Sequence, residues 1–213
     1  MSQPFRAEAS IVFIDLAGFS ASTDVYGDER ALAMLQIFED IVHDALGETS
    51  PLKWIGDEVM LALGDCATAL SLLGAILNKC RDEPRLPLTR TGVHCGPVLR
   101  RGADVFGATV NIASRLTALA GPGELLTTQQ MADVAKAAGV SVQDRGERQI
   151  RSVSAPLRVF AIEAAPAADP MWIDPVCKMH APLTAYRKAF GDQHWFCSTR
   201  CADAYRRNPA AYG

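Results

Sequence analysis

The sequence has no long hydrophobic run, no secretory pattern and no excess of positive charge. Its longest apolar stretch, residues 66–77, is shorter than the roughly 20 residues that a helix needs to cross a bilayer. The first ten residues, MSQPFRAEAS, lack the charged-then-apolar order of a signal peptide. The formal net charge of −3 gives no broad basic field for nucleic acid or an anionic membrane. We therefore expect a cytoplasmic protein that binds small ligands, anionic ones included, at local sites.

The sequence also lacks the cysteine spacing of a disulfide framework. Cys66, Cys80 and Cys95 are scattered along the chain, and isolated cysteines of this kind are usually buried as small apolar residues. The other three cysteines gather near the C-terminus, which indicates a separate role for them.

Composition divides the chain into a body and a short tail. A chain of 213 residues that is 49% hydrophobic can bury a full core and carry one small appendage. The stretch EAAPAADP, which begins at Glu163, is proline-containing and poor in large apolar residues, as linkers are. We predict a body over residues 1–163, a linker over 164–170 and a tail over 171–213.

Hydrophobic periodicity in the body predicts strands and helices in the order βαββαβ. The β-rich run IVFIDL precedes a helical pattern over 28–46, and PLKWIGDEVMLAL indicates two strands joined by a turn at 55–58. Further helices are predicted over 67–79 and 105–119, the second beginning after Gly107, and further strands over 88–99, 139–143 and 157–162. This order favours an α+β, ferredoxin-like sandwich with helices packed on one sheet.

Two carboxylates in the body follow strand-like segments. Asp15 ends the apolar run IVFID and precedes the turn LAGFS, whose backbone amides suit a phosphate. Asp57 lies at the tip of the predicted hairpin. Carboxylates at strand ends suit Mg²⁺, which fills its octahedron with water and substrate phosphates. Taken singly, each has a simpler interpretation, in which Asp15 caps the next helix and Asp57 is a turn residue.

Four motif-like segments follow one another along the body: FIDLAGFS, KWIGDEVM, TGVHCGPV and DVFGATVNIASRL. In this order they resemble the first metal motif, the hairpin, the glycine-punctuated strand and the Asn-Arg segment of class III adenylate and guanylate cyclase catalytic domains. The resemblance extends over residues 9–163. It implies the cyclase fold and the conversion of a nucleoside triphosphate to a cyclic nucleotide and pyrophosphate.

The resemblance also implies a two-metal mechanism. Asp15, Asp57 and the carbonyl of Leu16 would hold two Mg²⁺ or Mn²⁺ ions in each active site. The residues implied to bind the substrate next to them are Gly18, Phe19 and Ser20.

Two residues of the last motif complete the implied chemistry. Asn111 and Arg115 lie four apart, and therefore on one face of the predicted helix. By resemblance, Asn111 orients the ribose and Arg115 stabilises charge on the α-phosphate. In the family these residues and the metal carboxylates come from opposite partners, so the resemblance implies a homodimer with shared sites.

Lys53 and Asp104 match the positions that recognise the base in the family. An ammonium donor and a carboxylate acceptor complement N1 and the 6-amino group of adenine, whereas guanine presents the reverse pattern. The sequence therefore predicts ATP as substrate and cyclic AMP as product. Arg151 aligns with a basic position that grips the triphosphate, although the family often has Lys-Gly where this chain has Arg151-Ser152.

The tail carries Cys177, Cys197 and Cys201 in a C-x19-C-x3-C spacing. Thiolates that converge in this way suit Zn²⁺ or a copper ion. The segments DPVCKM, WFCS and NPAAY resemble the YHS domain and the related TRASH module, which implies a small treble-clef-like, metal-binding domain over 171–213. Lys178 stands where that module usually has glycine. The candidates for a fourth ligand are His180, His194, Asp174, a partner or water.

Several alternatives stay open at this point. The tail cysteines could be reduced and buried in a small structural unit, and a unit of this size needs a metal or docking on the body to be stable. The whole chain could be a catalytically silent module that senses nucleotide or metal. A metallochaperone is a third alternative, but it leaves the motifs of the body unexplained.

Overall fold

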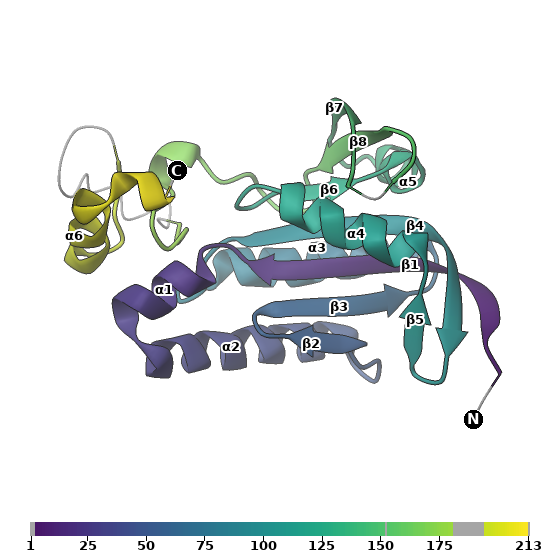
Figure 1. The fold of residues 1–213 in the computed structure, drawn as a ribbon, viewed down its shortest axis with the longest axis horizontal. Coiled ribbons are helices and arrows are strands. Elements are labelled where there is room, and N and C mark those ends of the chain that lie inside the picture. Colours follow the sequence, from purple (N-terminus) through teal and green to yellow (C-terminus); the bar gives the residue numbers. More distant parts are fainter. Residues whose placement is uncertain (1–2, 152, 181–193, 213) are drawn as a thin grey trace.

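One mixed sheet lies at the centre of the structure, a computed structural model that describes residues 3–151, 153–180 and 194–212. Its longest strands, β1 (Phe5–Leu16) and β4 (Thr89–Arg101), pair antiparallel along their whole length (Figure 1). The strand order is β2-β3-β1-β4-β6-β8-β7, and β5 pairs with β4. The shorter strands are β2 (Lys53–Ile55), β3 (Glu58–Leu63), β5 (Asp104–Phe106), β6 (Leu125–Thr127), β7 (Val142–Arg148) and β8 (Leu157–Ile162).

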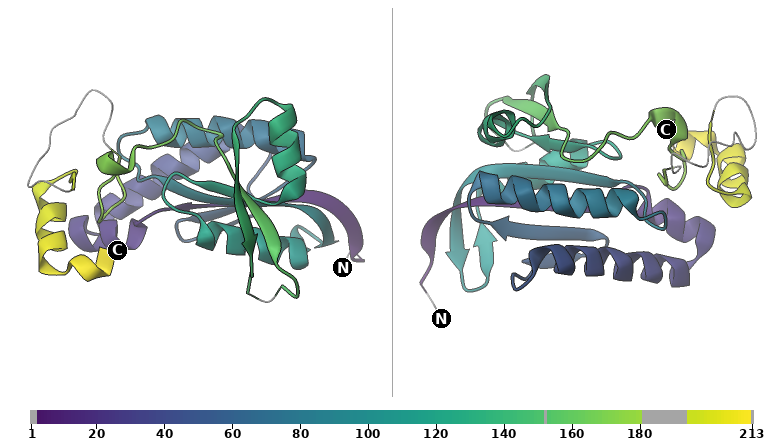
Figure 2. Two further views of the ribbon diagram at one scale, coloured as in Figure 1. Left: turned by 90° about the horizontal axis from the view of Figure 1, so that it is seen from above. Right: turned by 180° about the vertical axis from the view of Figure 1, so that it is seen from behind.

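Helices cover both faces of the sheet, which explains the continuous apolar run in β1. Alternate residues of a strand point to opposite faces. Val12 and Ile14 pack in the core under α2 and α3, whereas Ile11 and Phe13 belong to the core on the α4 side (Figures 1 and 2). The helices are α1 (Phe19–Tyr26), α2 (Asp28–Leu46), α3 (Cys66–Asp82), α4 (Ala108–Leu119), α5 (Gln129–Ala137) and α6 (Thr199–Arg207). Within the described ranges, none of the helices has the length and hydropathy to span a membrane.

Gly92 lets α4 lie directly against β4. A Cβ atom at this position would lie 2.3 Å from the Thr117 nitrogen and 2.4 Å from the Ala113 carbonyl oxygen. This close approach fixes α4 on the sheet and leaves Asn111 and Arg115 on its exposed side.

The observed elements confirm the predicted α+β order and correct some of its boundaries. The helix over 28–46 and the strand over 157–162 have the predicted bounds, and the hairpin turn falls between β2 and β3. The helix predicted from residue 105 begins instead at Ala108, because Asp104–Phe106 forms β5 against β4. The strand predicted over 139–143 is Val142–Arg148. The sequence interpretation missed α1, α5 and β6.

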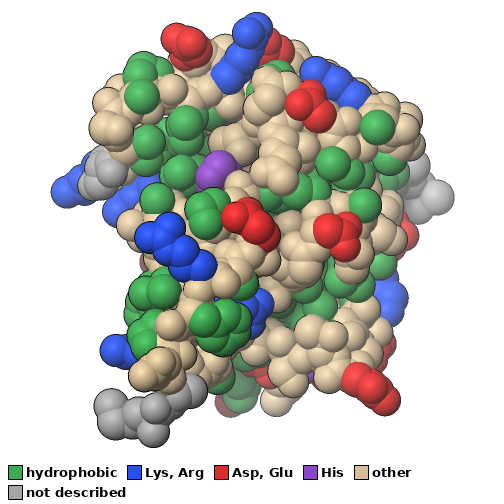
Figure 3. Space-filling view, turned by 90° about the vertical axis from the view of Figure 1, so that its right-hand side faces the viewer, with side chains coloured by type: hydrophobic (Ala, Val, Ile, Leu, Met, Phe, Trp, Pro, Cys, Tyr) green, Lys and Arg blue, Asp and Glu red, His purple; other side chains and the backbone are tan. Residues whose placement is uncertain are grey.

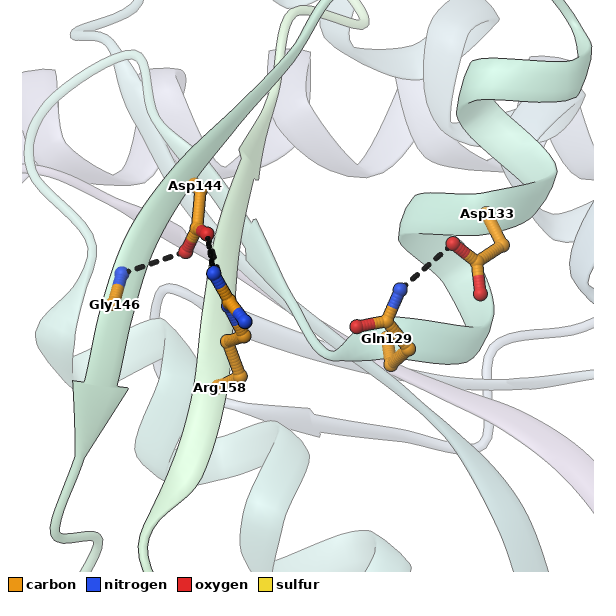
Figure 4. Close-up of polar contacts among 5 residues, drawn as sticks. All are labelled: Gln129, Asp133, Asp144, Gly146 and Arg158. Carbon is orange, nitrogen blue, oxygen red and sulfur yellow. Dashed lines mark hydrogen bonds and ion pairs between the residues drawn. The ribbon is translucent and has the colours of Figure 1, made fainter.

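Polar contacts fasten the edge of the sheet at β7 and β8. Within β7, Asp144 accepts a hydrogen bond from the Gly146 amide at 2.8 Å. It also accepts one at 2.5 Å from Arg158 Nη2, which lies on the neighbouring strand β8 (Figure 4). On α5, Gln129 donates to Asp133 at 2.7 Å. The face in Figure 3 shows Lys and Arg interspersed with Asp and Glu and with hydrophobic side chains, in keeping with the low net charge.

The tail docks on the body beside α1. Its described residues include two 3₁₀ turns, Pro170–Trp172 and Pro209–Tyr212, and α6, which packs against α1 (Figures 1 and 2). The Leu88 amide donates to the Lys178 carbonyl at 3.1 Å, so that the two regions share a main-chain hydrogen bond. The tail therefore has the docking on the body that its small size requires.

The three scattered cysteines differ from one another. Cys80 is buried and free, as expected for a small apolar residue. Cys66 and Cys95 are also buried, but the structure joins them in a disulfide that their sequence positions do not predict. Their pairing follows from the fold, because the start of α3 lies over β4.

Candidate active site and metal cluster

Asp15 lies at the end of β1, between charged residues on both neighbouring strands. It is opposite Glu58 of β3 and opposite Arg90 of β4. Arg90 donates to Oδ2 of Asp15 through Nε at 2.9 Å and also through Nη2. The Asp15 side chain is only 14% exposed, so this ion pair offsets a carboxylate that would otherwise be poorly solvated.

Asp57 and Glu58 add two more carboxylates to this end of the sheet. Gly56, with a φ of 63°, makes the tight turn that places them there. Burial, together with the charge of Asp15, raises the pKa of Asp57 to about 6. Burial also raises the pKa of Glu58 to about 7, together with the charges of Asp15 and Asp57. A divalent cation would relieve this repulsion. The sequence analysis did not select Glu58. The signal that could have identified it is its position, since it is an acidic residue directly after Asp57.

One cavity of about 370 Å³ gathers six of the predicted site residues. We call it the carboxylate cavity. Gly18 adopts a left-handed conformation, φ 73°, at the start of α1, which brings the turn after β1 to the cavity wall. The predicted residues that line it are Asp15, Leu16, Gly18, Phe19, Ser20 and Asp57; Arg90 and part of the tail complete the wall.

Lys53 and Asp104 are brought together although they are 51 residues apart. Lys53 Nζ, from β2, lies 2.7 Å from Asp104 Oδ2, from β5. The hydrogen bond from Lys53 lowers the pKa of the Asp104 carboxyl, so Asp104 is ionised at neutral pH. Both side chains are partly exposed and remain accessible to a ligand.

Like Lys53 and Asp104, the other three predicted residues of the body lie apart from the carboxylate cavity. Asn111 and Arg115 are exposed on α4, and no polar contact among the described residues joins either side chain to Asp15 or Asp57. Arg151 is exposed on the connection between β7 and β8 and does not line the cavity. A single chain therefore does not bring all the predicted residues together at one site.

In the tail, Asp174, Cys177, Cys197 and Cys201 converge. Their ligand atoms all lie within 4.8 Å of one another, and we call this group the thiol cluster. The Cys177 and Cys197 sulfurs are 3.4 Å apart, and the Cys197 and Cys201 sulfurs 3.7 Å. Three thiolates and one carboxylate oxygen are a ligand set that suits tetrahedral Zn²⁺.

Of the candidates for a fourth ligand, the structure brings only Asp174 to the cysteines. His180 Nδ1 lies 2.6 Å from Arg81 Nη1, and His194 Nε2 lies 3.1 Å from the Tyr205 hydroxyl. Asp174 also organises the turn, because Oδ1 accepts from the Val176 amide and Oδ2 from the Cys197 amide at 2.7 Å.

The thiol cluster favours one thiolate and resists a second. Hydrogen bonds from Cys177 and Cys197 lower the pKa of Cys201 to about 4. The pKa of Cys177 is raised instead, by its hydrogen bonds with Cys197 and Cys201 and by burial. Burial raises the pKa of Asp174 to about 6. A bound cation would stabilise the ionised forms of all these groups, and the cluster otherwise disfavours those of Cys177 and Asp174.

Tyr26 connects the thiol cluster to the body. Its hydroxyl lies 3.1 Å from Cys197 Sγ, 3.3 Å from Cys201 Sγ and 2.5 Å from Ser198 Oγ. Since Tyr26 ends α1, the helix that begins at the carboxylate cavity also contacts the cluster at its other end.

Taken together, the mixed sheet with helices on both faces and the carboxylates at the end of β1 define a nucleotide cyclase catalytic fold. The chain belongs to the adenylate and guanylate cyclase catalytic domain family, whose model matches residues 2–164. This confirms the family resemblance of the body. The tail lies beyond the match, so its resemblance to YHS domains stays a prediction.

Similar proteins and structures agree with this assignment. An adenylate cyclase of Streptomyces griseus is 36% identical over 110 residues, which are 51% of this chain and 28% of that protein. A pH-sensitive adenylate cyclase of Mycobacterium tuberculosis is 29% identical over 167 residues, 75% of this chain and 41% of that protein. The crystal structure of the adenylyl cyclase CyaB from P. aeruginosa matches 76% of this chain and 96% of its own, with a TM-score of 0.64 and 21% identity. This chain thus matches less than half the length of these curated relatives.

Proposed function

We propose that this chain is an adenylate cyclase that converts ATP to 3′,5′-cyclic AMP and pyrophosphate. The observation that carries the choice of ATP is the Lys53–Asp104 pair at 2.7 Å. A lysine donor beside a carboxylate acceptor complements N1 and the 6-amino group of adenine. With guanine, the same pair would face a donor and an acceptor of the wrong kind, and the polar groups of the base and of the pair would stay unpaired.

The carboxylate cavity supports the metal-dependent part of the proposal. Asp15, Asp57 and the carbonyl of Leu16 would hold two Mg²⁺ or Mn²⁺ ions, which when bound lower the pKa of the ribose 3′-hydroxyl and neutralise the phosphates. The turn Gly18 to Ser20 would bind phosphate oxygens beside them.

The remaining residues would act on the ribose and the reacting phosphate. Asn111 would orient the ribose for in-line attack of the 3′-oxygen on the α-phosphorus, with pyrophosphate as leaving group. Arg115 would stabilise the charge that develops on the α-phosphate. Arg151 would grip the departing phosphates.

Because one chain separates these residues, we propose a homodimer with two shared sites. The carboxylate cavity of one chain would meet Asn111, Arg115 and the base-recognising pair of its partner. Ile55 and Phe106, next to Lys53 and Asp104, are 53% and 39% exposed. Large apolar side chains beside a binding site support a partner that covers them.

We further propose that the thiol cluster holds Zn²⁺ or a copper ion and tunes the activity of the body. The convergent Cys₃Asp ligand set supports the metal, and the contact of Tyr26 with the cluster supports a link to α1. A copper ion would use the same thiolates, since soft ligands suit both metals.

A catalytically silent sensor of nucleotide or metal is the alternative function. The ion pair of Arg90 with Asp15 favours it, because that pair occupies a carboxylate that a metal needs. A cyclase converts nucleotide to product, whereas a silent sensor binds its ligand without converting it. Purified protein incubated with ATP or GTP and Mn²⁺ or Mg²⁺ should give cyclic AMP from ATP and much less product from GTP, measured by chromatography. Equal use of GTP would contradict the base-recognising role of Lys53 and Asp104, and no product from either nucleotide would favour the sensor.

A further inference from the structure

We infer that Lys178, a tail residue, supplies a positive charge to the triphosphate end of the active site in its own chain. The inference rests on the proposed function and deepens it, because it assigns a substrate-binding residue outside the cyclase domain. Three observations support it: the place of Lys178 in the cavity wall, the contacts of its ammonium group and the left-handed conformation of its backbone.

Lys178 lies in the wall of the carboxylate cavity. It lines the cavity together with Asp15, Asp57 and the turn Gly18 to Ser20. A Cβ atom built on Gly18 would lie 2.9 Å from Lys178 Cγ and 3.0 Å from the Cys177 carbonyl carbon, so the two segments are in direct contact. The hydrogen bond from Leu88 to the Lys178 carbonyl holds the same residue on the body from the other side.

No carboxylate among the described residues is in ion-pair contact with the Lys178 ammonium, although Asp174 attracts it from farther away. Its ammonium donates to the Pro175 carbonyl at 2.6 Å and to the Tyr212 carbonyl at 3.2 Å, and both of these residues also line the cavity. Arg90, the other cation in the wall, is paired with Asp15. A half-buried and unpaired ammonium beside the cavity would attract a polyanion, because charges near a protein surface interact more strongly than in bulk water.

The backbone of Lys178 points to a role for its side chain. Among the described residues other than glycine, Lys178 is the one with a positive φ, at 56°. This left-handed backbone is strained for a residue with a side chain. Glycine would adopt this conformation without strain. A lysine at such a position indicates a use for its ammonium, since strain of this kind collects at functional sites.

The test measures binding of inorganic tripolyphosphate and of adenosine, each with Mn²⁺, to the full-length protein by calorimetry. Lys178→Gly removes the charge and suits the backbone, Lys178→Arg keeps the charge, and Lys79→Ala is the control that removes an exposed lysine of α3. We expect Lys178→Gly to weaken tripolyphosphate binding about tenfold, with adenosine binding unchanged and the other two variants close to the wild type.

Kinetics supply a second readout. For ATP, Lys178→Gly should raise KM about tenfold and leave kcat within about threefold, because the lost contact is made to the ground state as well. Unchanged tripolyphosphate binding in Lys178→Gly would overturn the inference, and so would an equal loss of adenosine binding. A wild-type protein that binds tripolyphosphate more tightly than Lys178→Gly but turns over no ATP would refute the proposed cyclase activity and support the role of Lys178.

Discussion

The carboxylate cavity and the thiol cluster lie at opposite ends of the short helix α1, and they differ in almost every physical property. The cavity is open and carries hard oxygen ligands, and the pKa values of Asp57 and Glu58 are raised by burial and mutual repulsion. The cluster is largely buried, since Asp174, Cys177 and Cys201 are fully buried and Cys197 is exposed, and it carries soft sulfur ligands. There the pKa of one thiol, Cys201, is lowered by neighbouring donors.

This difference shows that one small chain presents two ligand sets that suit different kinds of metal. Oxygen ligands with room for water suit Mg²⁺ and Mn²⁺, whereas three thiolates select Zn²⁺ or copper. The separation is chemical rather than spatial, because Gly18 of the cavity contacts the backbone of Cys177 in the cluster. Changes at one site should therefore show how far the other depends on it.

The largest effect is expected from Asp57→Asn, which removes a charge from the carboxylate cavity. Loss of a metal ligand forfeits several kcal/mol of transition-state stabilisation, so cyclic AMP formation should fall at least about 1,000-fold. Asp133→Asn, at an exposed position of α5, is the matched control and should keep the wild-type rate. Tail metal content, measured by elemental analysis, should be the same in both. A wild-type rate in Asp57→Asn would exclude this residue as a metal ligand.

Mixing Asp57→Asn with Asn111→Ala tests whether the sites are shared. Each variant alone should be inactive. In a mixed dimer one site receives both lesions and the other receives neither, so an equal mixture with random exchange should regain about a quarter of the wild-type rate. If the mixture stays inactive while mass spectrometry shows heterodimers, the shared-site arrangement is wrong.

A smaller effect on catalysis, but a complete loss of tail metal, is expected from Cys197→Ser with Cys201→Ser. Removal of two thiolates should abolish stoichiometric Zn²⁺ or copper, and it should speed hydrogen exchange in the tail while the sheet stays protected. Cys80→Ala is the control, because Cys80 is buried and free elsewhere. Retention of the metal by the double variant would show that the thiol cluster is not its site.

The smallest effect is expected from Tyr26→Phe, which removes one hydroxyl from the edge of the thiol cluster. Groups that hydrogen-bond metal ligands typically change metal affinity by about tenfold or more, so Zn²⁺ affinity should fall by about that factor in a competition titration. Tyr205→Phe is the control, since its hydroxyl contacts His194 and no cysteine sulfur. Equal affinities of the two variants would mean that α1 and the cluster are not coupled through Tyr26.

Local patterns were enough to predict much of the fold and the composition of both sites. The helix over 28–46 repeats apolar residues at helical spacing along its whole length, and the hairpin has Gly56 at its turn, so nearby residues are enough to predict each of them. By contrast, β6 has only three residues, too few to show alternation. The segment Asp104–Phe106 continues into a helical pattern and becomes a strand because β4 offers it a partner.

The sequence by itself determined the family of the body and the kinds of ligand that each region presents: carboxylates after β1 and in the hairpin, and three cysteines in the tail. Only the tertiary structure decided which distant residues meet. It chose Asp174 over His180 and His194 beside the cysteines, joined Cys66 to Cys95, and set Lys178 against Gly18. The physical reason is that local spacing fixes turns and periodicity, whereas contacts between distant segments depend on how helices and strands pack around a shared core.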